Sequence, residues 1–126
     1  MKYKILFNTI FHKKVKRIDD KFGVVIIHGK QGSGKGYFAT QYLMLQDLSK
    51  CTYIKTNVHS LNVPNCEVRY FTKLDTICHD DDEYCIYLID ELSRKYKKNS
   101  QTDQDFYAWL NQSRKKKRIV ILITQE

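Results

Sequence analysis

The stretch GVVIIHGKQGSGKG, residues 23–36, decides the fold of this chain. Its first six residues are mostly apolar and are followed by a glycine, as expected of a strand buried on both faces. Residues 29–36 then contain the pattern G-x-x-x-x-G-K, the core of a P-loop, in which glycines let successive backbone N–H groups turn toward phosphate oxygens. The N-terminus of the next helix adds partial positive charge, and Lys35 can reach the β- and γ-phosphates. The predicted nucleotide-binding residues are Gly29, Gln31, Gly32, Ser33, Gly34, Lys35, Gly36 and Tyr37.

Beyond this stretch, segments with strand-like and helix-like spacing of apolar residues alternate along the chain. The spacing predicts helices at 35–48 and 103–112 and strands at 52–57, 84–89 and 119–124. A short extended segment is expected at 66–71. Strands alternating with helices call for a mainly parallel sheet with helices on both faces. We therefore expect an α/β fold of the P-loop NTPase type, with residues 23–126 as the core domain and residues 1–22 as a basic N-terminal extension.

Two carboxylates follow the strand predicted near residue 89. IYLIDE, residues 86–91, is a Walker B arrangement. In such an arrangement Asp90 would hold Mg²⁺ directly or through water, and Glu91 would orient and deprotonate the water that attacks the γ-phosphate. The last predicted strand leads to Gln125, and a polar residue at the carboxyl end of a strand beside the P-loop strand is a candidate γ-phosphate sensor. These features predict ATP and Mg²⁺ as cofactors.

One position departs from the P-loop pattern. Where a serine or threonine would supply a hydroxyl to Mg²⁺, this chain has Gly36. Three consequences are open from the sequence. Water completes the shell of the metal, which Mg²⁺ tolerates; or Ser33 or Thr40 compensates; or hydrolysis is impaired.

The composition fits a single folded domain. A chain of 126 residues can bury a sizeable core. Its longest apolar stretches fall far short of the ~20 residues that span a bilayer, and its first residues make a poor secretory signal, so we expect a cytoplasmic protein. The cysteines lack the spacing of a metal site, and we expect them to be reduced packing residues: Cys51, Cys66, Cys78 and Cys85.

The net charge of +8 is concentrated in two basic clusters that flank an acidic middle. Residues 1–22 contain seven basic and two acidic side chains, and residues 94–118 contain nine and two. Such clusters attract polyanions, namely nucleic acid or an anionic membrane surface, but they also serve as a solubilising surface. If they bind nucleic acid, the binding should be weak, salt-sensitive and indifferent to sequence, because phosphate contacts release counterions.

The set of motifs resembles the inovirus morphogenesis ATPases, the zonular occludens toxin-like (Zot) family of the additional-strand, catalytic-glutamate P-loop class. The similarity lies in GKQGSGKGYFA, TNVHSLN, LIDE and RKKKRIVILITQ, at residues 29–39, 56–62, 88–91 and 114–125. The resemblance implies a cytoplasmic motor domain, peripheral at the inner membrane, that uses ATP to drive phage assembly and extrusion of single-stranded DNA. It also implies a homo-oligomer in which Arg114 acts as a trans-acting finger on a neighbour's ATP.

Two other functions are compatible with the same residues. Gly36 after the loop lysine, and Arg94 four residues after Asp90, also resemble nucleoside monophosphate kinases, although the sequence shows no recognisable lid segment. The third hypothesis is a nucleotide-binding or DNA-binding module without turnover, of which Gly36 would be the mark.

Overall fold

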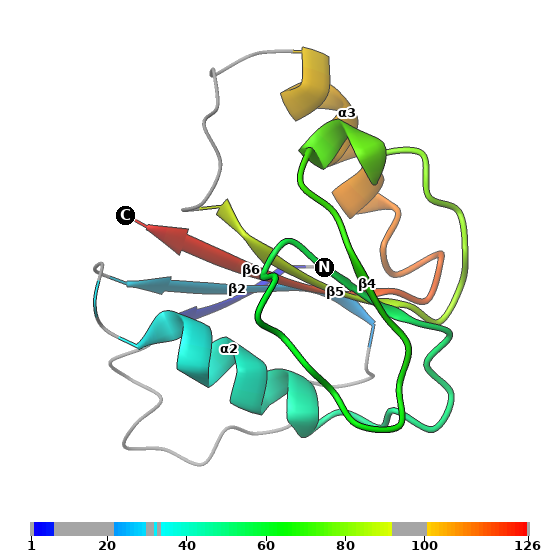
Figure 1. The fold of residues 1–126 in the computed structure, drawn as a ribbon. Coiled ribbons are helices and arrows are strands. Elements are labelled where there is room, and N and C mark those ends of the chain that lie inside the picture. Colours follow the sequence, from blue (N-terminus) through cyan, green and yellow to red (C-terminus); the bar gives the residue numbers. More distant parts are fainter. Residues whose placement is uncertain (1, 7–21, 30–31, 33, 92–100, 126) are drawn as a thin grey trace.

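Figure 1 shows the fold of the chain as a computed structural model, which describes residues 2–6, 22–29, 32, 34–91 and 101–125. The strands of this part form one all-parallel sheet of six strands in the order β1-β2-β6-β5-β3-β4. In chain order the elements are β1 (Lys2–Leu6), β2 (Gly23–Gly29), α2 (Lys35–Met44), β3 (Ile54–Thr56), β4 (Val68–Tyr70), the 3₁₀ turn η1 (Leu74–Thr76), β5 (Ile86–Asp90), α3 (Gln101–Asn111) and β6 (Ile119–Gln125). The predicted α/β architecture with a parallel sheet is confirmed.

The sheet is the middle layer of three. Helix α2 covers one face, and α3 covers the other together with η1 (Figure 1). Because side chains alternate along a strand, each central strand feeds two cores. In β5, Ile86 and Leu88 pack in the core beneath α2, whereas Tyr87 and Ile89 pack in the core beneath α3. This double burial explains why the central strands are continuous apolar runs.

Two elements differ from the sequence-based expectation. Helix α2 ends at Met44 rather than near residue 48, because Asp47 accepts hydrogen bonds from both the backbone N–H and the hydroxyl of Ser49, which holds a turn there. The second difference is β1, which was not predicted as a strand. It pairs in parallel with β2, so residues 2–6 of the expected extension belong to the same sheet as the core.

The parallel topology gives the sheet two distinct edges, which we call the carboxyl edge and the amino edge after the strand ends found there. At the carboxyl edge, β2, β6 and β5 end side by side, with Gly29 paired to Gln125 and Asp90 paired to Ile123 (Figure 1). The predicted phosphate loop therefore starts at the same edge as the predicted acids, one strand away from them. None of the helices in the described ranges combines the length and the apolar character that crossing a membrane requires.

Candidate nucleotide site

The glycine-rich loop joins the carboxyl end of β2 to the first turn of α2. Gly32 and Gly34 have φ angles of 79° and 86°, in the left-handed region that side chains other than glycine adopt only with strain. A side chain added at Gly32 would meet no atom within 4 Å, so the backbone angle rather than crowding requires glycine there. At Gly32 and Gly34 the backbone is thus in a conformation typical of a tight turn, and beside Gly32 there is open space, which is what a close approach of phosphate needs.

Helix α2 begins at Lys35 with no side-chain cap at Gly34, so within the described residues its first-turn N–H groups are not capped by a side chain. The Nζ of Lys35 donates a hydrogen bond to the carbonyl oxygen of Gly29 at 2.5 Å, which spans the loop from its last residues to its first. The side chain is only 4% exposed. A buried ammonium needs oxygen acceptors. Phosphate oxygens at this position would accept hydrogen bonds from Lys35 in addition to the Gly29 carbonyl, or in its place.

Gly36 lies in the first turn of α2 with nothing within 4 Å of the position that a Cβ would occupy. Protein packing therefore does not require glycine here. Of the two residues that the sequence suggested as a substitute hydroxyl, Thr40 donates to the carbonyl of Gly36 at 2.9 Å, one turn further along the helix. Its hydroxyl is engaged within the helix and lies about one helical pitch, ~5 Å, from the loop. Thr40 is thereby a poor replacement, and Ser33 lies outside the described residues.

The two acids lie where the sequence predicted them, at the end of β5. Asp90 is the last residue of the strand and Glu91 follows it, and both side chains are half-buried. By alternation along the strand, Asp90 belongs to the same face of the sheet as Leu88, the face that α2 covers. The main chain of Asp90 is bonded to the side chain of Asn57, a contact that the sequence did not reveal.

The structure brings together some of the other predicted residues and separates one. Gln125 pairs in register with Gly29, which puts its backbone beside the start of the loop. Tyr37, in the first turn of α2, is 74% exposed. Arg114 is exposed and precedes β6, so the seven residues of that strand, roughly 20 Å, separate it from the carboxyl edge of its own chain. Gln31 lies outside the described residues.

The basic run before β6 does not form one charged surface. Arg118 is buried, with 1% exposure, while Lys116 and Lys117 form ion pairs with Asp81 and Glu83 at 2.6 Å and 3.8 Å. Arg114 and Lys115 remain exposed. The other basic residues of the expected clusters lie outside the described residues, apart from Lys2 and Lys4 in β1. Part of the charge that suggested a polyanion surface therefore stabilises the fold.

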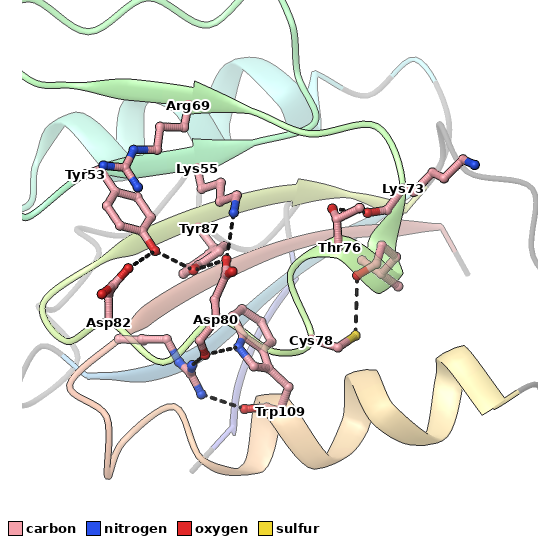
Figure 2. Close-up of polar contacts among 12 residues, drawn as sticks. Tyr53, Lys55, Arg69, Lys73, Thr76, Cys78, Asp80, Asp82, Tyr87 and Trp109 are labelled. Carbon is pink, nitrogen blue, oxygen red and sulfur yellow. Dashed lines mark hydrogen bonds and ion pairs between the residues drawn. The ribbon is translucent and has the colours of Figure 1, made fainter.

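A polar network at the amino edge, which sequence analysis missed, is shown around Asp80, Tyr87 and Trp109 in Figure 2, and Arg118 belongs to it. Its guanidinium donates to the carbonyl oxygens of Asp80 and Trp109 at 3.0 and 2.9 Å and lies over the Trp109 ring. The carboxylate of Asp80 accepts from Tyr87 at 2.7 Å and from Lys55 at 2.8 Å. These contacts tie the acidic segment, residues 80–83, to β3, β5 and α3.

Burial changes the proton affinity of groups in and near this network. It raises the pKa of the Tyr87 hydroxyl far above its usual value, an effect that the hydrogen bonds to Tyr53 and Asp80 reinforce. Burial likewise raises the pKa of Tyr53. Elsewhere, burial and the neighbouring Cys66 raise the pKa of the Cys51 thiol to about 12. The described cysteines are free thiols.

The residues at the carboxyl edge fit a nucleotide better than they fit a metal ion alone. Among the described residues, no group of three or more histidines, cysteines or acids could hold a metal. A P-loop site does not need one, because waters and the substrate phosphates together supply most of the ligands of Mg²⁺ and the protein adds one or two. Comparison of the chain with protein-family models and with curated proteins finds no match. The functional argument therefore rests on the geometry of this edge.

Proposed function

We propose that the chain is an ATP-binding and hydrolysing P-loop domain of the additional-strand, catalytic-glutamate class. The observation that carries the proposal is the strand order β2-β6-β5, in which one strand separates the loop strand from the strand that ends in the acids. The positive φ angles of Gly32 and Gly34 and the buried Lys35 at the start of α2 support it. Together they supply a curved backbone, a helix N-terminus and a cation on one side of β6, and carboxylates on the other.

In this proposal the residues divide the work by their positions. Bound ATP and Mg²⁺ would supply the reactive phosphoanhydride and the neutralising charge. The loop N–H groups and the Lys35 ammonium would bind and orient phosphate oxygens, and the Asp90 carboxylate would hold the metal directly or through a water. Glu91 accepts the proton of a water molecule at its carboxylate oxygen, and Gln125 senses the γ-phosphate.

The first experiment measures nucleotide binding by the effect on thermal and urea unfolding. A ligand at 100 times its Kd stabilises a protein by about 2.7 kcal/mol, so binding of ATP should be easily detected. Lys35→Ala should lower the affinity at least tenfold, and Lys50→Ala, an exposed lysine beyond α2, should leave it unchanged. No protection by any nucleoside triphosphate, or equal affinity of wild type and Lys35→Ala, would refute the proposal.

Gly36 is the residue that leaves alternatives to ATP hydrolysis open. Because no serine or threonine stands there, two other functions remain compatible with the same residues: a nucleoside monophosphate kinase-like phosphotransferase, and a binding module with no turnover. Radiolabelled ATP distinguishes the three cases. Release of labelled phosphate indicates the ATPase, transfer of the label to AMP to give ADP indicates the kinase, and binding without either product indicates the module.

The partners in this proposal follow from the resemblance to Zot-like motors rather than from contacts of the chain. They are single-stranded DNA, further copies of the chain in a homo-oligomer, and phage assembly or inner-membrane proteins. Exposed Arg114 and Lys115 are the described part of a DNA surface. DNA affinity should fall steeply between 50 and 200 mM salt if phosphate contacts dominate, and a constant affinity would count against DNA as a partner.

A further inference from the structure

Asn57 stands directly after β3, at the carboxyl edge and next to the end of β5. Its side-chain amide makes two hydrogen bonds to one residue of β5. The Nδ2 group donates to the carbonyl oxygen of Asp90 at 3.0 Å, and Oδ1 accepts from the backbone N–H of Asp90 at 2.7 Å. Both are good geometries for hydrogen bonds that use each end of the amide once.

These two bonds take the place of a strand that has ended. The ladder between β3 and β5 stops at the pair of Thr56 with Leu88, yet Asp90 lies two residues further along. The backbone groups that Asp90 turns toward β3 would have no strand partner there, and a backbone group left unpaired in a buried site is costly. The Asn57 side chain supplies both the donor and the acceptor that a longer β3 would have offered.

Asn57 is itself held by the turn that begins at Thr56. The buried hydroxyl of Thr56 accepts from the N–H of Val58 at 2.9 Å, and the Thr56 carbonyl accepts from the N–H of Phe71 at 3.0 Å. The chain therefore leaves the sheet at a fixed point and direction. Because its own backbone is fixed in this way, Asn57 can hold the main chain of Asp90 in one orientation.

We propose that Asn57 is a positioning residue for Asp90, and through it for the Mg²⁺ that accompanies the nucleotide. This inference rests on the proposed function. By fixing both backbone groups of Asp90, Asn57 fixes the direction in which that carboxylate leaves the strand end. Groups that orient a metal-binding acid typically change metal affinity or activity by about 10- to 100-fold when removed. Because Gly36 supplies no hydroxyl, a larger share of metal positioning falls on Asp90 in this chain.

The test compares Asn57→Ala with Asn62→Ala, an exposed asparagine in the same loop. The first readout is amide hydrogen exchange in the nucleotide-free protein, where Asn57→Ala should speed exchange at Asp90 at least tenfold and leave β2 unchanged. The second is the affinity for a fluorescent ATP analogue in EDTA and in Mg²⁺. Asn57→Ala should match wild type in EDTA and lose at least tenfold of the affinity gained from Mg²⁺, while Asn62→Ala should match wild type in both.

Failure of the positioning role of Asn57 and failure of the proposed function would give different results. An unchanged Mg²⁺ gain in Asn57→Ala overturns the positioning role, even if exchange at Asp90 has increased. If wild type binds no nucleotide, the proposed function itself has failed, and the positioning role falls with it whatever the exchange rates show. Should Asn57→Ala not fold, Asn57→Gln carries the same test, because its amide is one methylene too far out to make both bonds. A Mg²⁺ gain equal to that of wild type would again overturn the proposal.

Discussion

The two edges of the sheet both contain many polar and charged side chains, but they use them differently. At the amino edge these side chains bond to one another, as Asp80 does with Tyr87 and Lys55, and also to backbone carbonyls, as Arg118 does. At the carboxyl edge Lys35 bonds the carbonyl of Gly29, and Asn57 bonds the main chain of Asp90. Charge density therefore does not distinguish the two edges. Backbone shape does, because within the described residues only the carboxyl edge combines glycines in the left-handed region with a helix N-terminus.

The largest expected difference between the edges is in turnover. Glu91→Gln should lower ATP hydrolysis by about 10²- to 10⁴-fold, the range that a positioned general base contributes, and should leave ATP affinity within about twofold. Glu83→Gln removes a carboxylate at the amino edge and should leave turnover unchanged. Phosphate release under saturating ATP measures both. Turnover that survives Glu91→Gln would remove this residue as the base.

The converse difference should appear in stability. Arg118→Ala removes one of the donors to each of two carbonyls and opens a cavity against Trp109, so the free energy of unfolding should fall by about 3 kcal/mol. Arg114→Ala removes the same side chain from an exposed position and should change it by less than about 0.5 kcal/mol. Urea unfolding gives both values. Equal losses would mean that Arg118 contributes no more to the fold than a surface arginine.

These two arginines also show how far sequence reasoning reached. The strand-loop-helix unit, the acids after β5 and the parallel sheet were predictable, because each depends on local patterns of apolar spacing and glycine. The burial of Arg118 and the exposure of Arg114 were not, since both belong to one basic run and differ only in which side of the chain meets the core. Asn57 was expected as the last residue of a strand, but its partner Asp90 is 33 residues away and only the strand order brings them together. Strand β1 was missed because its lysines alternate with apolar residues over just five positions.

The buried tyrosines of the amino edge should make the stability of the fold depend on pH in the alkaline range. The hydroxyls of Tyr53 and Tyr87 have raised pKa values in the folded state, whereas tyrosines in the unfolded chain titrate near pH ~10. Above that pH the unfolded state has lost protons that the folded state retains, so stability is fully present below pH ~10 and falls as the pH rises, by up to about 1.4 kcal/mol per pH unit for each hydroxyl.

Urea unfolding between pH 8 and 11 tests this dependence. Tyr87→Phe should reduce the slope of stability against pH by about one proton. A stability that is constant up to pH 11 would contradict the burial of these hydroxyls.

The smallest effect that we expect concerns Gly36, at the carboxyl edge. Gly36→Ser and Gly36→Ala both replace a helical glycine whose side-chain position is open, so each should stabilise the protein by up to about 1 kcal/mol. Only serine adds a hydroxyl at the place where Mg²⁺ would be bound. Gly36→Ser should therefore raise the Mg²⁺-dependent part of ATP affinity severalfold, and Gly36→Ala should not. If the two variants behave alike in Mg²⁺ and EDTA, the metal does not lie beside residue 36. Asp90 and the metal's own water ligands would then position it without a hydroxyl from residue 36.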